Sequence, residues 1–105
     1  RESVPGTHST LCDSLMTPTP GALTWSINRT TVSNFLVVTE DEVRHAVSFA
    51  FRFMKLVVEP GGAVALAALL SKKLNLDGQE LALILSGGNI DPLVLDNCLS
   101  EYPDP

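Results

Sequence analysis

Two glycine-containing turns carry the side chains of this sequence that are best suited to bind a ligand. Residues 59–62 read Glu-Pro-Gly-Gly, and residues 86–89 read Ser-Gly-Gly-Asn. The first turn offers a carboxylate, and the second offers a hydroxyl and an amide. Glycine pairs let the backbone approach a ligand closely or adopt a positive φ. Because a plain passage from strand to helix also uses glycine, neither turn by itself establishes a site.

Each turn follows a short apolar run that is typical of a buried strand. Residues 56–58 are Leu-Val-Val, and residues 81–85 are Leu-Ala-Leu-Ile-Leu. Continuous apolar strands of the second kind are expected in sheets that are covered on both faces. In open α/β sheets, ligands bind beyond the carboxyl ends of the strands. Both turns therefore lie where such a sheet would bind a ligand.

The remaining pattern predicts helices between these strands. Residues 35–38 are a further strand, and Thr39 with Glu42 forms a capping box at the start of the helix that follows. Asp91 is expected to cap the last helix. Helices are predicted at 20–33, 39–55, 63–73 and 92–100. Strands and helices thus alternate, which favours an α/β fold with short, mainly parallel strands. We expect residues 1–105 to form a single domain, with an irregular segment over 1–18 and a short strand near 11–15.

Two of these helices carry more apolar surface than one small core requires. Helix 63–73 is apolar all round and is expected in the interior. On helix 39–55, Phe49 and Phe53 form a second apolar pair, whereas Ser48 and Arg52 are expected off the buried face and His45 at the surface. The predicted buried face of that helix is Val43, Ala46, Val47, Ala50, Phe51 and Met54. With 45% apolar residues in 105, we expect burial against another copy or a missing piece of chain.

Charge and composition argue against several function classes. The net charge of −5 disfavours nucleic-acid binding. The N-terminus has no signal-peptide core, and the longest apolar run, 63–70, is too short to cross a bilayer. Cys12 and Cys98 are expected to be reduced thiols in a cytoplasmic protein. His8 and His45 lack partners at metal-ligand spacing, so no metal site is predicted.

Taken together, the two turns and their flanks resemble the serine/threonine dehydratase and serine racemase family. These are pyridoxal-phosphate enzymes of the tryptophan-synthase-β fold (fold type II). The resemblance rests on 56–69 and 84–91, and it extends upstream through 11–15, 19–24 and 38–43. It covers nearly the whole chain and corresponds to about the last third of a family member. The chain is thus similar to the C-terminal part of such an enzyme.

The resemblance implies roles for the residues of both turns. Ser86 would hydrogen-bond the pyridine nitrogen of pyridoxal phosphate, and Glu59 would lie near the cofactor. A neutral hydroxyl moderates the electron-sink character of the ring, which suits elimination. Gly87, Gly88 and Asn89 would shape the turn rather than react.

The sequence also departs from the family pattern. Lys55, Lys72 and Lys73 are the only lysines, all at predicted helix ends, and they are interpreted as solvated cations. Neither the Schiff-base lysine of the family nor its phosphate-binding glycine loop is found. We therefore expect no catalytic residue in this chain, no cofactor bound by it alone, and a parent activity of L-serine or L-threonine dehydration or racemisation.

Two other interpretations stay open. The chain could be a non-enzymatic α/β module that assembles with other copies, as a dimer or an intertwined oligomer. It could also bind a small molecule at the Ser86 turn without covalent chemistry. If the parentage is enzymatic, the partner expected is a complementing N-terminal chain. Nucleic acid and membrane are not expected as partners.

Overall fold

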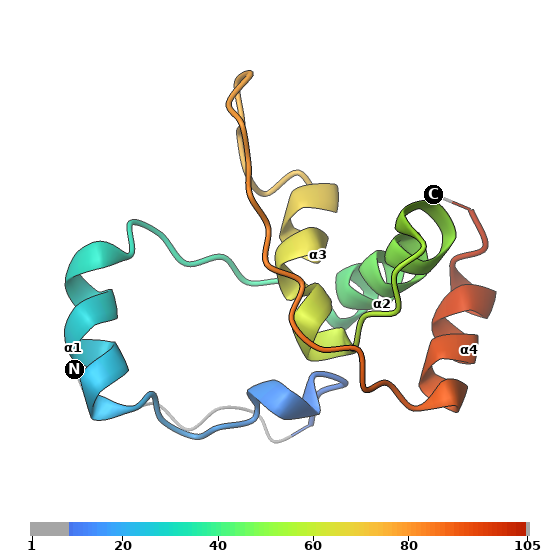
Figure 1. The fold of residues 1–105 in the computed structure, drawn as a ribbon, viewed down its shortest axis with the longest axis horizontal. Coiled ribbons are helices and arrows are strands. Elements are labelled where there is room, and N and C mark those ends of the chain that lie inside the picture. Colours follow the sequence, from blue (N-terminus) through green and yellow to red (C-terminus); the bar gives the residue numbers. More distant parts are fainter. Residues whose placement is uncertain (1–8, 105) are drawn as a thin grey trace.

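Helix α2 (Glu40–Phe49) lies at the centre of the structure, a computed structural model that describes residues 9–104. It packs against α3 (Val64–Leu70) and against α4 (Pro92–Glu101), and Figure 1 shows these two helices flanking it. Helix α1 (Ala22–Thr31) stands apart and packs against no other described element. The hydrophobic core therefore lies among α2, α3 and α4.

The start of α2 is fixed by the predicted capping box. The Thr39 hydroxyl accepts a hydrogen bond from the Glu42 N–H (3.2 Å), and the Glu42 carboxylate accepts one from the Thr39 N–H (2.7 Å). Glu40 fastens the N-terminal segment to the same place, since its carboxylate accepts from the Leu11 N–H (2.8 Å) and from the Thr10 hydroxyl. The predicted capping box is confirmed, and it fixes the N-terminal end of the central helix.

A π-helical turn, η2 (Ala50–Met54), extends α2 and ends at Lys55 in a left-handed conformation (φ 59°). A π turn has i→i+5 hydrogen bonds and holds more residues than an α turn, so it shifts the helical phase. The predicted buried face is therefore wrong for Phe51 and Met54, which are exposed. It is confirmed for Val43, Ala46, Val47 and Ala50.

Helix α4 covers a side of α2 that the sequence predicted to be exposed. Ser48 is only 1% exposed and donates its hydroxyl to the Tyr102 carbonyl (2.5 Å). Arg52 donates to the Ser48 hydroxyl (3.2 Å) and to the Leu99 carbonyl (2.7 Å). The off-face prediction for Ser48 was wrong because α4, which is distant in sequence, supplies polar partners there.

His45 lies on the same side of α2. Its ring is half-buried and stacks against Tyr102, with ring centroids 5.4 Å apart, and meets Phe49 edge-on. The prediction of a surface histidine was therefore also wrong, since the C-terminal end of α4 brings an aromatic neighbour to it. Nearby, Arg44 and Glu101 form an ion pair at 3.0 Å.

Helix α3 is buried on one side only. It follows η3 (Pro60–Ala63), a short 3₁₀ turn formed by the Glu-Pro-Gly-Gly sequence. Leu66, Ala67 and Ala68 are buried, as predicted for an interior helix. Val64, Ala65, Leu69 and Leu70 are only half-buried. The outer flank of α3 therefore lacks the cover that its apolar sequence predicts.

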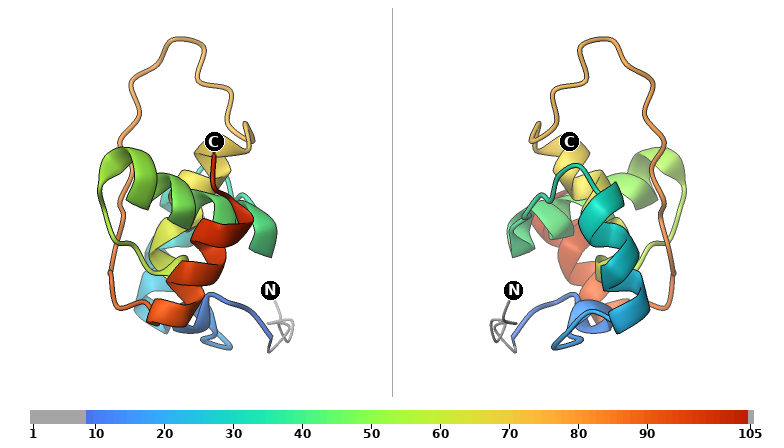
Figure 2. Two further views of the ribbon diagram at one scale, coloured as in Figure 1. Left: turned by 90° about the vertical axis from the view of Figure 1, so that its right-hand side faces the viewer. Right: turned by 90° about the vertical axis from the view of Figure 1, so that its left-hand side faces the viewer.

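The three predicted strands are not assigned as strands. Within residues 9–104 the structure contains helices and irregular segments, and residues 33–38 and 80–86 make no backbone–backbone hydrogen bond. Val37 and Ile84 are each 83% exposed. Figure 2 shows the chain after α3 looping away from the helices before it returns to α4. A strand needs a neighbour to complete its ladder. The helix order is confirmed, and the parallel sheet stays a prediction.

The N-terminal segment is helical where a strand was predicted. Asp13–Leu15 form a 3₁₀ turn, η1, so the strand predicted near 11–15 was wrong. Residues 1–8 of the predicted irregular segment, with His8, lie outside the described part of the chain.

Cys12 and Cys98 are both free and buried. Of the helices described, none combines the length and apolar character that crossing a membrane requires.

Leu66→Asp is expected to abolish cooperative folding. Leu66 is 3% exposed, so the substitution would bury an unpaired carboxylate at a cost of about 3–5 kcal/mol, comparable with the stability of a small domain. Leu23→Asp is the matched control, because Leu23 is exposed on α1. Circular dichroism during urea titration should show a lost transition for the first variant and an unchanged midpoint for the second. Equal midpoints would show that α3 is not part of the core.

Both thiols are expected to resist modification in the folded protein. Burial raises the pKa of Cys12 and of Cys98, and the neighbouring Glu40 carboxylate acts in the same direction on Cys12. A raised pKa keeps each group as the unreactive thiol at neutral pH. A chromogenic disulfide reagent should therefore react slowly at pH 7.5 and rapidly after urea is added. Fast modification of either cysteine without denaturant would contradict its burial.

Candidate functional site

The Glu-Pro-Gly-Gly and Ser-Gly-Gly-Asn turns form one site in the structure. The Glu59 N–H donates a hydrogen bond to the Gly87 carbonyl (3.1 Å). Gly62 packs against the Ser86 carbonyl so closely that a Cβ at Gly62 would lie 1.9 Å from that oxygen. Gly88 approaches the Val57 carbonyl in the same way, with its Cβ position at 2.7 Å. The two candidate sites of the sequence are thus brought together, backbone against backbone.

The Glu59 carboxylate lies across the second turn. A Cβ on Gly87 would be 2.6 Å from Oε1 of Glu59, and Gly87 adopts a φ of 82°. Gly87 therefore meets two requirements, since it provides the left-handed conformation and leaves room for the carboxylate. The prediction that Gly87 shapes the turn has a specific geometric basis here.

Ser86 and Asn89 are exposed, whereas Glu59 is half-buried. The Ser86 backbone packs closely against Gly62, and Ser86 itself is an exposed residue. A hydroxyl can both donate and accept a hydrogen bond, and a carboxylate can accept one. This arrangement can hold and orient a polar ligand. The sequence identified Ser86 and Glu59, but it gave Gly62 no role in positioning Ser86.

The lysines are engaged or directed elsewhere. Lys55 donates to the Arg52 carbonyl (2.7 Å). Lys73 donates to the Val37 carbonyl (2.7 Å) and to the Glu42 carboxylate (2.7 Å). The hydrogen bond to the Glu42 carboxylate lowers the pKa of Glu42. Lys72 is exposed and follows α3. The contacts of Lys55 and Lys73 agree with the prediction that these two lysines do not serve the turns.

The site fits one end of pyridoxal phosphate, the cofactor that the resemblance implies. Ser86 is exposed and its hydroxyl is of the type that can bond the pyridine nitrogen, and the Glu59 carboxylate lies against Gly87, the next residue. The lysine contacts do not fit the aldehyde end, which requires an available amine. Residues 9–104 also contain no group of three acidic, histidine or cysteine side chains that could hold a metal ion.

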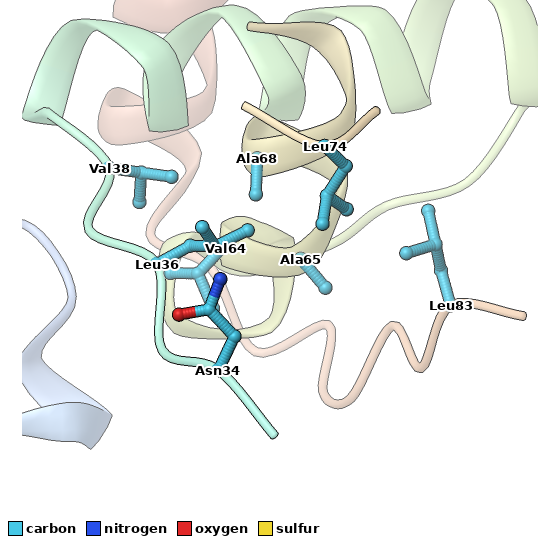
Figure 3. Close-up of a pocket in the computed structure, with 8 residues that line it drawn as sticks. All are labelled: Asn34, Leu36, Val38, Val64, Ala65, Ala68, Leu74 and Leu83. Carbon is cyan, nitrogen blue, oxygen red and sulfur yellow. The ribbon is translucent and has the colours of Figure 1, made fainter. Parts of the chain in front are cut away.

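A second feature, which the sequence did not reveal, is an apolar groove on the outer flank of α3. Its volume is about 290 Å³. Figure 3 shows α3 as its floor, with Leu36 and Leu83 on opposite sides. The residues lining the groove are Asn34, Leu36, Val38, Val64, Ala65, Ala68, Leu74 and Leu83. The sequence signal that could have indicated it is the apolar run 81–85, which is extended in the structure and makes no backbone–backbone hydrogen bond within the described residues.

Comparison with known proteins places these turns in a family. The family model described as "Pyridoxal-phosphate dependent enzyme" matches residues 1–87. Serine racemase of Dictyostelium discoideum is 36% identical over 93 residues, which is 87% of this chain and 28% of the relative. L-threonine ammonia-lyase of Thermotoga maritima is 36% identical over 92 residues, covering 88% of this chain and 23% of the relative. The catabolic L-threonine dehydratase TdcB of Escherichia coli K12 is 41% identical over 87 residues, 81% of this chain and 26% of the relative.

These matches confirm the resemblance on which the role of Ser86 was based. The chain spans about a quarter of the length of the curated relatives that it matches. The family match covers both the Glu-Pro-Gly-Gly turn and the first two residues of the Ser-Gly-Gly-Asn turn. This chain therefore belongs to the family of pyridoxal-phosphate-dependent enzymes.

Proposed function

We propose that this chain supplies the cofactor-ring contact of an enzyme that dehydrates or racemises L-serine or L-threonine. Dehydration would eliminate water from the amino acid, and hydrolysis of the resulting imine would take one water up again. The net products would be a 2-oxo acid and ammonia. The observation that carries the proposal is the packing of the two turns against each other, with the Ser86 backbone against Gly62 and residue 86 exposed. The relatives named as serine racemase and L-threonine dehydratase support the substrate class.

Within such an enzyme, Ser86 would hydrogen-bond the pyridine nitrogen and orient the ring. When bound, the cofactor supplies an electron sink for breaking a bond at the substrate Cα. A neutral hydroxyl stabilises a ring proton less than a carboxylate would, which favours elimination or racemisation. The Glu59 carboxylate, held across Gly87, would keep the second turn in place beside the ring.

Catalysis would require groups from outside these residues. Lys55 and Lys73 are bonded elsewhere, and the glycines at 62, 87 and 88 are occupied in packing the two turns together. An amine to hold the aldehyde and a loop to hold the phosphate would come from another part of the enzyme or from a complementing chain. The chain alone would then be inactive. Its two free, buried thiols suit the reducing cytoplasm that we propose as its location.

The first test is of the chain by itself. Purified protein is incubated with equimolar pyridoxal phosphate and reduced with borohydride. Peptide mass spectrometry should then find no single lysine that is labelled in full. It should also produce no 2-oxo acid from L-serine or L-threonine. A single lysine labelled in full, or measurable turnover, would contradict the proposal that the amine comes from elsewhere.

The second test adds a chain that could supply the amine and the phosphate-binding loop. Co-expression with the part of E. coli TdcB that precedes its region of similarity should give 2-oxo acid from L-threonine in the presence of pyridoxal phosphate. Ser86→Ala in this chain should lower kcat/KM by at least about tenfold, the effect of losing one hydrogen bond of about 1.5–3 kcal/mol to a charged or polarised group. Ser100→Ala, at an exposed position of α4, is the control and should leave the rate unchanged. Equal rates for the two variants would contradict the proposed role of Ser86 in binding the cofactor ring.

Gly62→Ala should damage the site where Gly61→Ala does not. The new methyl group at Gly62 would meet the Ser86 backbone carbonyl at 1.9 Å, whereas at Gly61 it would meet the Ser14 hydroxyl, which can rotate away. Forced backbone shifts of this kind cost about 1–3 kcal/mol. Urea unfolding should show a lower midpoint for Gly62→Ala and a near-native midpoint for Gly61→Ala. The reverse order would contradict the packing of the turns.

A further inference from the structure

Helix α4 is capped at its C-terminal end by side chains from another part of the chain. The last carbonyl groups of a helix have no partner within the helix, and a basic side chain in the last turn or a left-handed glycine often serves them. The last turn of α4 contains no basic residue, and Tyr102, which follows it, has a φ of −126°. The carbonyls of Leu99 and Tyr102 nevertheless both accept hydrogen bonds.

The donors are Arg52 of η2 and Ser48 of α2. Arg52 donates through Nη2 to the Leu99 carbonyl (2.7 Å) and through Nε to the Ser48 hydroxyl (3.2 Å). The Ser48 hydroxyl donates in turn to the Tyr102 carbonyl (2.5 Å), and Ser48 is only 1% exposed. A cation at the negative end of a helix dipole strengthens such a contact. This cap therefore fixes where α4 lies along α2 (Figure 1).

The same arginine connects the flanks of the two glycine turns. Residues 55–58 lead from η2 into the Glu-Pro-Gly-Gly turn, and Ile90 and Asp91 lead from the Ser-Gly-Gly-Asn turn into α4. The Ile90 N–H donates to the Gly88 carbonyl (3.0 Å), and the Asp91 carboxylate accepts from the Leu93 N–H (2.8 Å). Hydrogen bonds thus tie the second turn to the start of α4. A shift of α4 along α2 would move residues 86–89 relative to Glu59.

We propose that Arg52 is a positioning residue, which holds Ser86 in place by capping the helix behind it. Gly62 and the Glu59 N–H fix the two turns where they touch. Arg52 fixes the far end of α4, so that the second turn is restrained from both sides. The inference rests on the proposed function for what this position accomplishes, which is the contact of the Ser86 hydroxyl with the cofactor ring.

Arg44 provides a matched comparison. It also links α2 to α4, but through the Glu101 side chain at 3.0 Å, and the two side chains are 36% and 45% exposed. An exposed ion pair contributes little to stability, and this one leaves the carbonyls of α4 without a cap. Arg44 therefore shares with Arg52 the charge and the pair of helices, without the contact on which the proposal depends.

The first experiment measures the turns in this chain without cofactor. Nuclear magnetic resonance follows hydrogen exchange at the Glu59 and Ile90 amides, which bond carbonyls of the second turn. In Arg52→Met both amides should exchange at least about tenfold faster, because a charged hydrogen bond contributes at least the roughly 1.4 kcal/mol that corresponds to this factor. Amides of α3 should change less, since α3 packs on α2 without contacting α4. Arg44→Met should leave these rates near those of the unmodified chain.

A conservative variant keeps the experiment decisive if Arg52→Met does not fold. Lysine retains the charge of Arg52 but has one nitrogen in place of a planar fork, so it cannot reproduce both hydrogen bonds. Arg52→Lys should therefore give exchange rates at Glu59 and Ile90 between those of the unmodified chain and those expected for Arg52→Met. Rates equal to those of Arg44→Met would contradict the proposal.

The second experiment asks whether Arg52 acts through the Ser86 hydroxyl. It uses this chain co-expressed with the part of E. coli TdcB that precedes its region of similarity. Arg52→Met should lower kcat/KM by part of the loss that Ser86→Ala causes, and it should add almost nothing in the Ser86→Ala background. Residues that act through one shared contact give such non-additive changes. A variant that only weakened the fold would lower both backgrounds by the same factor.

Four results would overturn the proposal: unchanged exchange at Glu59 and Ile90 in Arg52→Met, equal acceleration at these amides and throughout α3, the same effect from Arg44→Met, or additive losses with Ser86→Ala. Failure here is distinguishable from failure of the proposed function. Faster exchange at the turns without any 2-oxo acid formation would support the cap and contradict the cofactor role. Activity that depends on Ser86 but not on Arg52 would do the opposite.

Discussion

The close approach of two glycine turns determines the geometry of the candidate site. At Gly62 the backbone of the first turn lies against the Ser86 carbonyl, and the Glu59 N–H bonds the Gly87 carbonyl. Close-packed backbones leave no space for a side chain at Gly62 and restrict the position of the Ser86 backbone. Ligand orientation by that hydroxyl would depend on this contact more than on any charged group nearby.

The helical body supports the turns through its polar as well as its apolar contacts. α3 begins directly after the first turn, and α4 begins shortly after the second, so both turns are tied to helices that pack on α2. Ser48 and Arg52 fasten the end of α4 to α2 through backbone carbonyls. Buried polar groups are stable when they are hydrogen-bonded, and these are. The result is a three-helix base from which the site projects.

The outer surface of the same base is incomplete. The apolar segments on either side of α3 are exposed, and an isolated strand gains little from its extended form without a neighbour. Membership in the pyridoxal-phosphate-dependent family, together with a span of about a quarter of its relatives, gives this surface a natural explanation.

Local chemistry allowed the sequence to determine the caps at Thr39 and Asp91, the helix order and the family through its two turns. These features depend on residues that are near one another in the chain. The burial of Ser48, the phase shift at the π turn and the merging of two turns into one site were decided by tertiary contacts. Each depends on which distant segment packs alongside, and residue types and spacing within one segment carry no record of that neighbour.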